Sequence, residues 1–490
     1  MTGLFKSIII FSLILVFSQT SVFAQHENNL KDRPPNVIIV LIDTLRPDHL
    51  NFYGFTEETA EFLGKLSDNS VVFKRAFSTS SWTAPSTASL FTSQYPYQNG
   101  VMEGMIANNV RKVKIAAMGQ TSIPLNMIPR SIQTLPEFFK SLGYSTYGIS
   151  ANINISKEIG FSRGFDHFTN EHGYWANDFY NQLKKWKNKI QQSEPFLLYL
   201  HYNDVHSPYK KQDKYYKMGK LDQIIITSCK FAQAIIDKLG LNNHPRLKSI
   251  NQKIEHYIHM EERAKYISEI GFFDAYFERT YQLLNMSENT ILVVLSDHGE
   301  EFMEHGKFGS HGFKLYNELN QVLMLFHAPS LNFTPRYYEE NVSLIDVLPT
   351  LAEIVNQKIP EDVSGTSLYP LLRDLPNTNR FHKKLQDRFI FAHRINKIDK
   401  SGQPEKQLWS TIHKNYRLIE NPDNIYELYD HQRDIKEQQN IFSRHPEISS
   451  KLILKLKEAK AENNHAKYEK TQMVMDQAIL GELRGLGYVQ

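Results

Sequence analysis

The chain reads Ser80-Ser81-Trp82-Thr83-Ala84-Pro85-Ser86-Thr87-Ala88-Ser89-Leu90-Phe91-Thr92 where a hydroxyl-rich segment passes into an apolar, alanine-containing run. The run predicts a helix, and Pro85 is typical of a first helical turn, where its missing N–H costs nothing. We therefore expect Thr83 at or just before a helix N-terminus, where free N–H groups and the helix dipole favour an anion. Two interpretations stay open. Thr83 attacks a phosphate or sulfate ester bound there, or Thr83 or Ser81 merely caps the helix.

The bulk composition narrows the class of protein. The chain has 490 residues, a formal net charge of +3 and one cysteine, Cys229. This length allows a large domain and a smaller one. The nearly balanced charge implies no polyanion-binding surface, so we expect no nucleic-acid partner. A single cysteine excludes a disulfide framework and a cysteine zinc site within one chain.

The N-terminus has the pattern of a secretory signal peptide over residues 1–24. Lys6 supplies a short basic region, residues 7–17 are mostly apolar, and Val22-Phe23-Ala24 places small residues before a cleavage site. The alternative is an uncleaved anchor, but the apolar run is short for a membrane span. We expect a periplasmic or secreted protein without a stable membrane span after cleavage.

Two strands end in residues that can bind a metal. The run Asn36–Ile42 is continuously apolar and largely β-branched, which is typical of a buried parallel strand, and Asp43 follows it. The hydrophobic strand 290–296 is followed by Asp297-His298. Open α/β sheets place ligands at the carboxyl ends of their strands, and an Asp beside a His suits a metal. The alternative for Asp43 is a helix cap or a turn residue.

Histidines follow the same predicted sheet edge. His206 comes just after the buried strand 195–202, and His305 and His311 come after the Asp297-His298 pair. Lone histidines in loops are usually surface residues. Whether His305 or His311 enters the site stays open.

The order of elements predicts an α/β fold, with a large, central, mostly parallel sheet flanked by helices and a smaller C-terminal α+β domain. Strands and helices alternate up to about residue 375, and shorter, antiparallel-type strands begin at 388. We expect a linker at 25–35, a catalytic domain at 36–375, a lysine-rich helical insertion over one edge of the site at 210–262, and a C-terminal domain at 388–490.

Taken together, these motifs resemble the sulfatase family of the alkaline phosphatase superfamily. The segment Thr83-Ala84-Pro85-Ser86-Thr87 sits where sulfatases carry Cys/Ser-x-Pro-x-Arg, and His206-Ser207-Pro208 matches the family's His-x-Pro. The strands before Asp43 and Asp297 are similar to the two metal strands, and 345–350 and 425–430 match later landmarks. The resemblance covers most of residues 35–450 and rests on the order and spacing of the motifs.

The chain also departs from the sulfatase pattern. Thr83 cannot become the formylglycine that active sulfatases make from cysteine or serine. Thr87 stands where sulfatases place an anion-binding arginine. In place of a Gly-Lys-Trp-His-type segment the chain reads Gly148-Ile149-Ser150-Ala151-Asn152. Several groups of the sulfate pocket are therefore missing, and Thr87 and Asn152 become the candidate substrate-binding residues.

A threonine nucleophile with an Asp-His pair resembles phosphodiesterases, phosphoethanolamine transferases and lipoteichoic acid synthases of the same superfamily. That resemblance implies one divalent cation, and Mn²⁺, Zn²⁺ or Mg²⁺ suits such ligands better than Ca²⁺. The implied metal ligands are Asp43, Thr83, Asp297 and His298. Thr44 replaces a second family aspartate, which argues against a second metal.

The implied chemistry is attack by Thr83 on a phosphoester through a phospho-threonine intermediate. His206 or His311 would steady a non-bridging oxygen or protonate the leaving group. We expect an exported hydrolase acting on an anionic ester of a glycan, lipid or small molecule, with phosphoric esters preferred. The alternatives are a sulfatase that works without formylglycine and an inactive module that binds anionic glycans. A transferase would need a lipid or glycan acceptor.

Overall fold

The computed structural model describes residues 34–104, 122–242, 244–375, 378–398, 404–462 and 470–474. The expected signal peptide and all but the last two residues of the expected linker lie outside the described residues. No helix in these ranges is long and apolar enough to cross a membrane.

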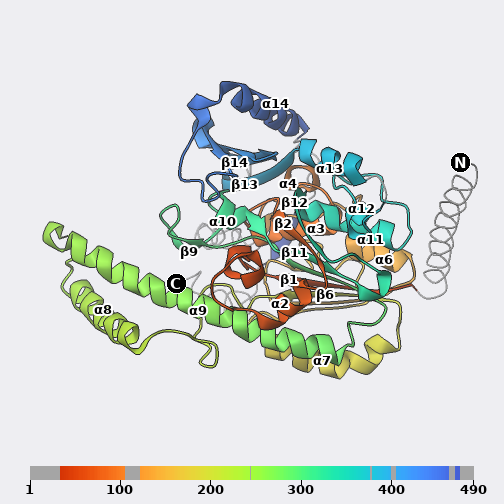
Figure 1. The fold of residues 1–490 in the computed structure, drawn as a ribbon, viewed down its shortest axis with the longest axis horizontal. Coiled ribbons are helices and arrows are strands. Elements are labelled where there is room, and N and C mark those ends of the chain that lie inside the picture. Colours follow the sequence, from red (N-terminus) through yellow and green to blue (C-terminus); the bar gives the residue numbers. More distant parts are fainter. Residues whose placement is uncertain are drawn as a thin grey trace, which may run out of the picture.

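The centre of the molecule is a nine-stranded sheet (Figure 1). In pairing order its strands are β10 (Gln321–Val322), β2 (Val71–Phe77), β11 (Met324–His327), β7 (Thr290–Ser296), β1 (Asn36–Ile42), β6 (Phe196–Tyr202), β4 (Ser145–Ser150) and β5 (His167–Asn170), and β12 (Arg336–Ser343) pairs with β2. The strands from β7 to β5 are all parallel, whereas β10 and β11 are antiparallel to their neighbours. The expected α/β fold with a mostly parallel sheet is confirmed.

The register of the central strands brings the predicted metal residues to one edge. Ile42 of β1 lies opposite Ser296 of β7 and Tyr202 of β6. All three strands are buried along their whole length, as their continuous apolar sequences predict. The residues that follow the three strands therefore leave the sheet side by side.

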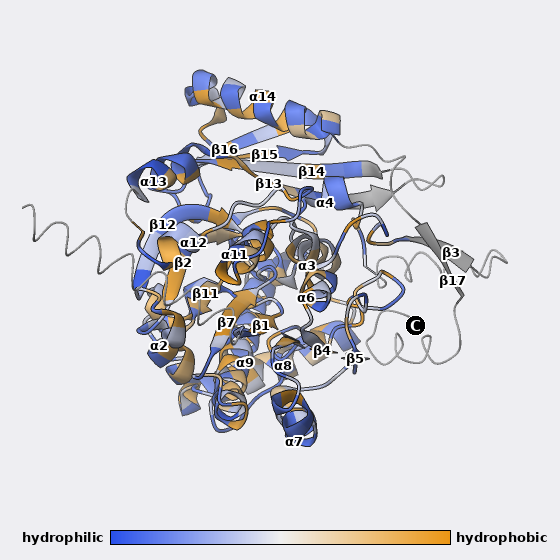
Figure 2. Ribbon diagram, turned by 90° about the vertical axis from the view of Figure 1, so that its right-hand side faces the viewer, coloured by the Kyte–Doolittle hydropathy of each residue, from blue (hydrophilic) through white to orange (hydrophobic). Residues whose placement is uncertain are grey.

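Helices cover both faces of the sheet. Alternate residues of β1 contribute to two apolar cores, one shared with α3, α6 and α11, the other with α2, α7 and the second half of α9. Figure 2 shows the hydrophobic colouring along β2 and β7 in the interior. The helices of the body are α2 (Glu61–Ser67), α3 (Thr83–Thr92), α4 (Pro96–Asn99), α6 (Leu135–Ser141), α7 (Ala176–Gln191), α9 (Lys248–Leu283), α10 (Asn317–Asn320), α11 (Val347–Ile354) and α12 (Tyr369–Leu372).

The predicted insertion forms a helical hairpin, which we call the arm and define as residues 220–262. It consists of α8 (Lys220–Lys238), a short 3₁₀ turn (Pro245–Leu247) and the first part of α9. Figure 1 shows both helices projecting from the body. The helix α9 runs without a break from the arm into the body. At the root of the arm, His259 stacks on Phe308 with 4.3 Å between ring centroids.

A second, antiparallel sheet lies in the C-terminal part of the chain. Its strands are β13 (Ile390–Ile398), β14 (Pro404–His413), β15 (Tyr416–Asn421) and β16 (Ile425–Asp430), preceded by α13 (Thr378–Asp387) and covered by α14 (Pro446–Glu462). Two small sheets pair β8 (Glu301–Phe302) with β9 (Phe308–Ser310) and β3 (Ser122–Asn126) with β17 (Lys470–Val474).

The C-terminal sheet is joined directly to the segment that precedes α3. The backbone N–H of His393 in β13 donates to the carbonyl of Thr79 at 2.9 Å. The guanidinium of Arg394 lies 4.9 Å from the ring centroid of Trp82 and donates to the carbonyl of Gly312 at 2.7 Å. The predicted nucleophile segment is therefore held between the two sheets.

Candidate active site

Asp43, Asp297 and His298 form a buried group at the carboxyl edge of the central sheet. One ligand atom from each lies within 4.8 Å of the others, which makes this group a candidate metal site. Nε2 of His298 is 3.6 Å from Oδ1 of Asp43 and 3.4 Å from Oδ2 of Asp297. A tetrahedral metal site with bonds of about 2.1 Å has edges of about 3.4 Å, so these separations suit one cation.

The hydrogen bonds of the two carboxylates leave their metal-facing oxygens unused. Oδ1 of Asp43 and Oδ2 of Asp297 are buried and have no hydrogen-bond partner. The other oxygen of Asp297 accepts from the backbone N–H of Thr44 at 3.2 Å and of His298 at 2.9 Å. Buried oxygens without partners are costly. The residues present therefore fit a divalent cation.

Burial and mutual repulsion set the charges of this group. Burial and the neighbouring charge of Asp43 raise the pKa of Asp297 well above its ordinary value. Burial and the charge of His311 lower the pKa of His298 to about 3, so its imidazole is neutral at pH 7, as a metal ligand requires. Without a cation, two adjacent buried carboxylates cannot both be ionised at low cost.

Thr83 lies against this group as the first residue of α3. Its Oγ1 is 3.2 Å from Nε2 of His298. Trp82 is the N-cap residue and no side chain caps the helix, while Oγ of Ser81 has no hydrogen-bond partner. The interpretation of Thr83 or Ser81 as a helix cap is therefore wrong. The position of Pro85 in the first turn is as predicted from the sequence.

Asn152 and His201 hold the other oxygen of Asp43. Nδ2 of Asn152 donates to Oδ2 of Asp43 at 2.5 Å, and Nε2 of His201 lies 3.3 Å from the same oxygen. Oη of Tyr199 is 3.0 Å from Nδ1 of His201. Burial alone would raise the pKa of Asp43, but the hydrogen bond of His201 and the charges of His206 and His298 hold it below its ordinary value. Sequence reasoning missed His201, although a histidine inside an apolar strand was the signal.

His311 and His206 border the group on a second side. The ring of His311 lies 4.6 Å from that of His298 and 5.0 Å from that of His206, centroid to centroid. Nδ1 of His311 is 3.0 Å from Oε1 of Glu300, whose other oxygen accepts from the hydroxyl of Tyr209 at 2.9 Å. Burial opposes the charged form of His311, but Glu300 raises its pKa. No motif in the sequence distinguishes Glu300 or Tyr209 from their neighbours.

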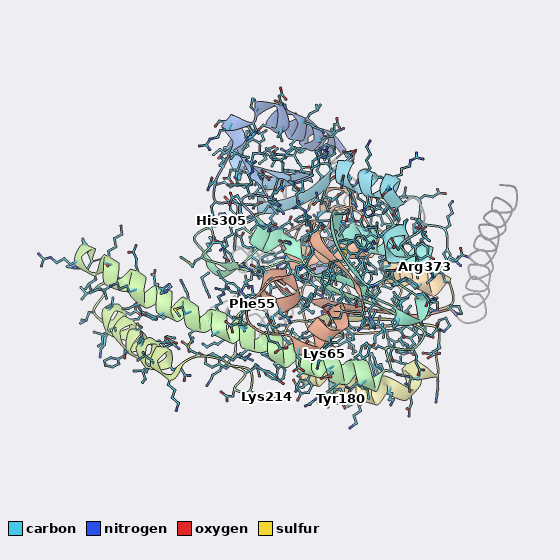
Figure 3. The ribbon with its side chains drawn as sticks, viewed as in Figure 1. Phe55, Lys65, Tyr180, Lys214, His305 and Arg373 are labelled. Atoms are coloured by element: carbon cyan, nitrogen blue, oxygen red, sulfur yellow. The ribbon has the colours of Figure 1, made fainter. Side chains whose placement is uncertain are left out.

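The remaining candidates lie in different environments. Thr87 is buried one turn after Thr83 in α3, and its Oγ1 has no partner. His305 turns away from the metal group, because its ring stacks on Tyr316 and its Nδ1 is 2.7 Å from Oε1 of Glu318. Figure 3 labels His305 close to the C-terminal sheet. Of the two histidines left open by the sequence, His311 is the one beside the metal group.

Comparisons with known proteins agree with this architecture. The family described as Sulfatase matches residues 35–357, and the one described as N-sulphoglucosamine sulphohydrolase, C-terminal, matches residues 303–463. A Delta 4,5-hexuronate-2-O-sulfatase of Bacteroides thetaiotaomicron is 20% identical over 437 residues, which cover 83% of this chain and 84% of the relative.

Solved structures share the fold at low sequence identity. A protein in complex with its substrate D-glucosamine-2-N,6-O-disulfate superposes with a TM-score of 0.64 and 17% identity, covering 88% of this chain and 98% of its own. The phosphonate monoester hydrolase of Agrobacterium radiobacter gives a TM-score of 0.62 and 15% identity, covering 88% of this chain and 96% of its own. Because the Sulfatase match spans well over half of the sequence, this chain belongs to the sulfatase family of ester hydrolases.

Proposed function

We propose that this chain is a metal-dependent hydrolase that prefers phosphoric to sulfuric esters and uses Thr83 as its nucleophile. The observation that carries the proposal is the distance of 3.2 Å between Oγ1 of Thr83 and Nε2 of His298, at the first residue of α3. This hydroxyl stands where the family carries a cysteine or serine that becomes formylglycine. A threonine cannot undergo that conversion, and an alkoxide of threonine is suited to displacement at phosphorus.

Asp43, Thr83, Asp297 and His298 would hold one divalent cation, with Mn²⁺, Zn²⁺ or Mg²⁺ as candidates. Such a cation, when bound, lowers the pKa of a hydroxyl and offsets charge on a transferring phosphoryl group. Asn152 and His201 keep Asp43 turned toward the ligand position through the contacts they make with Oδ2. These two residues therefore position a ligand of the metal.

The chain's own residues supply the other parts of the reaction. The hydroxyl of Thr83 loses its proton to solvent water, and Oγ1 forms a bond to phosphorus while the bond from phosphorus to the leaving oxygen breaks. Free N–H groups at the start of α3 bind the non-bridging oxygens. His311, held by Glu300, or His206 donates a proton to the leaving oxygen or a hydrogen bond to a non-bridging one. Water then cleaves the bond between phosphorus and Thr83.

The substrate class is an anionic ester, phosphorylated or sulfated, of a glycan, lipid or small molecule. One relative is named as a sulfatase of a hexuronate, and one structural neighbour is named in complex with a sulfated glucosamine. Both names favour a glycan substrate. Thr87 and Asn152 are kept as candidate substrate-binding residues, because Oγ1 of Thr87 has no partner and Asn152 adjoins the metal group. Export to the periplasm or medium is part of the proposal and rests on the pattern of residues 1–24.

A second candidate is hydrolysis of sulfuric esters without formylglycine. The relative of Bacteroides thetaiotaomicron favours it, since its name is that of a sulfatase. The two candidates differ in the chemical identity of the ester and not in the residues that hold it.

Hydrolysis of two nitrophenyl esters by the purified protein separates the candidates. Bis-nitrophenyl phosphate and nitrophenyl sulfate are each assayed with Mn²⁺ or Zn²⁺. We expect turnover of the phosphodiester that is lost in Thr83→Ala and partly kept in Thr83→Ser. The matched control is Ser89→Ala, which removes an unpartnered hydroxyl from the same helix and should leave the rate unchanged.

Other outcomes would contradict the proposal. Turnover of the sulfate alone would favour the second candidate. Full phosphodiesterase activity in Thr83→Ala would exclude Thr83 as the nucleophile. Inactivity on both esters without bound metal would favour an anion-binding module.

A further inference from the structure

The exposed side of α8 carries an apolar stripe, which we define as Leu221, Ile224, Phe231, Ile235 and Leu239. Their exposed fractions are 70%, 63%, 70%, 44% and 63%. The spacing of three, seven, four and four residues places all five on one side of the helix. The arm therefore presents a continuous row of large apolar side chains to solvent.

This stripe is not the face that holds α8 on α9. Ile226 and Ile236 are the residues of α8 that are buried, and Ile254 is their buried counterpart on the first part of α9. A helix that packs on one neighbour needs only one apolar face. The second face is unexplained by the fold, and Figure 3 shows the side chains of the arm standing clear of the body. A large exposed apolar patch marks an interaction site.

Basic residues accompany the stripe. Along α8 the sequence has three Lys and two Asp. Lys220 and Lys238 are both exposed and lie five helical turns apart, on the same flank of the stripe. Neither forms an ion pair with any of the residues that the structure describes, unlike Lys230, which lies 2.5 Å from Glu261. The surface that fits this flank is negatively charged.

We propose that the arm binds an anionic lipid surface, with α8 lying in the plane of the interface. The stripe would enter the boundary between headgroups and acyl chains, and Lys220 and Lys238 would contact lipid phosphates. Amphipathic helices with Lys at the edge of an apolar face bind membranes in this way. The proposal concerns the arm alone and does not depend on the reaction that the active site performs.

A second copy of the chain fits the stripe less well. Antiparallel pairing of two α8 helices along the stripe would place Leu221 against Leu239 and Ile224 against Ile235. The same pairing would bring Lys220 of each copy against Lys238 of the other, and like charges at such positions are destabilising. A lipid surface accepts both the apolar stripe and the lysines without this conflict.

Binding through the arm would also keep the active site near the lipid. His259, at the root of the arm, stacks on Phe308 of β9, and His311 follows that strand directly. The arm is joined to the body by one continuous helix, α9. An ester in or near a membrane surface would then be within reach of the site.

Co-sedimentation of the full chain with vesicles tests the proposal. Vesicles of phosphatidylcholine alone are compared with vesicles containing phosphatidylglycerol, at two salt concentrations. We expect binding to the anionic vesicles that weakens with salt. Phe231→Glu and Ile235→Glu should each weaken it at least about tenfold, and Lys220→Glu and Lys238→Glu about fivefold or more each. Far-UV circular dichroism checks that each variant is folded.

Matched control variants lie on α14, which is remote from the arm in Figure 1. Leu454→Glu replaces an apolar residue that is 58% exposed, and Lys457→Glu reverses an exposed lysine. Both should bind vesicles as the unmodified chain does. Absence of binding to anionic vesicles, or binding that survives Phe231→Glu and Ile235→Glu, would overturn the proposal. A dimer in lipid-free solution that these two variants dissociate would instead assign the stripe to a second copy.

Discussion

Two of the buried acid–histidine clusters in the described part of the chain differ in how the protein neutralises them. In the metal group, Asp43 and Asp297 each have a buried oxygen without a partner. At the junction with the C-terminal sheet, Glu437 is equally buried, but it lies 3.1 Å from Nε of Arg417 and 2.5 Å from Nε2 of His431. Both clusters place a buried carboxylate beside a histidine.

The pKa values of Asp297 and Glu437 move in opposite directions, although both carboxyls are buried. Burial and the charge of Asp43 raise the pKa of Asp297. Burial also opposes the ionised form of Glu437, but the charge of Arg417 and the contact with His431 together lower its pKa. A buried carboxylate with an arginine is completed by the fold. Asp297 instead keeps a buried oxygen that no described residue satisfies, and this difference separates a functional site from a structural one.

Neutralising one acid of the metal group should give the largest effect. We expect Asp297→Asn to lower esterase activity by at least about 10³-fold, because a ligand of the catalytic metal is lost. The same change removes repulsion between two buried carboxylates. The metal-free variant should therefore unfold at a higher temperature than the metal-free unmodified protein. Equal or lower thermal stability would mean that the two acids do not oppose each other.

Neutralising the acid of the other cluster should lower the stability of the protein instead of raising it. Glu437→Gln leaves Arg417 buried without its counter-ion, and breaking a buried pair in this way costs about 3–5 kcal/mol. Urea denaturation measures the loss in free energy of unfolding. If Glu437→Gln were neutral while Asp297→Asn were destabilising, the comparison of the two clusters would be wrong.

Removal of metal should affect only the first cluster. A cation at 100 times its Kd stabilises the folded state by about 2.7 kcal/mol. We expect a chelator to lower the unfolding temperature of the unmodified protein and of Glu437→Gln by similar amounts. Asp297→Asn should respond little, because its site no longer binds the cation well. Differential scanning calorimetry before and after metal is restored makes this measurement.

A histidine behind the metal group should have a smaller effect. We expect His201→Leu to weaken metal affinity about 10–100-fold, the usual effect of losing a residue that orients a ligand. The matched control is His327→Leu, since His327 is also a buried strand histidine that contacts a tyrosine hydroxyl, at 3.1 Å from Oη of Tyr281. Isothermal titration with Mn²⁺ compares the two variants. Equal losses of metal affinity in the two variants would mean that His201 does not orient Asp43.

The smallest effect on stability concerns His305, which lies away from the metal group and is paired with Glu318. Burial opposes its charge, but the contact with Glu318 raises its pKa above 6.5. Its stabilising contribution is therefore complete below pH 6.5 and is lost as the pH rises through the raised pKa. The side chain of His305 is 12% exposed, and we expect the loss to be about 1 kcal/mol, the order of one hydrogen-bonded pair. Unfolding free energies at pH 6 and pH 8 should differ less in His305→Gln than in the unmodified protein.

The sequence predicts the sheet and the metal group well, because both follow from local patterns. Continuous apolar runs identify β1, β6 and β7, and parallel strands bring their carboxyl ends together. Asp43, Asp297 and His298 could therefore be grouped from sequence alone. The strand β12 was not predicted, since its residues Arg336-Tyr337-Tyr338-Glu339-Glu340 are polar and its edge pairing with β2 depends on distant contacts.

Other parts of the site depend on side-chain contacts between distant segments. Glu300 reads in the sequence as one acid among several, and only its contact with His311 distinguishes it from Glu301. The stacking of His305 on Tyr316 likewise follows from a loop conformation that no short motif specifies. Periodicity predicts which face of an element is buried, but it does not predict which two side chains meet across a loop.

The hydrogen bond from His393 to Thr79 has a consequence for how the molecule is made. It joins residues that are 314 positions apart in the chain, directly beside the segment that leads to Thr83. Contacts this distant form late, because the closure of a long loop must come first. During synthesis the metal ligands up to His298 emerge long before β13 does. We therefore expect a nascent chain that stops before β13 to be inactive, because the segment that leads to Thr83 then lacks this contact.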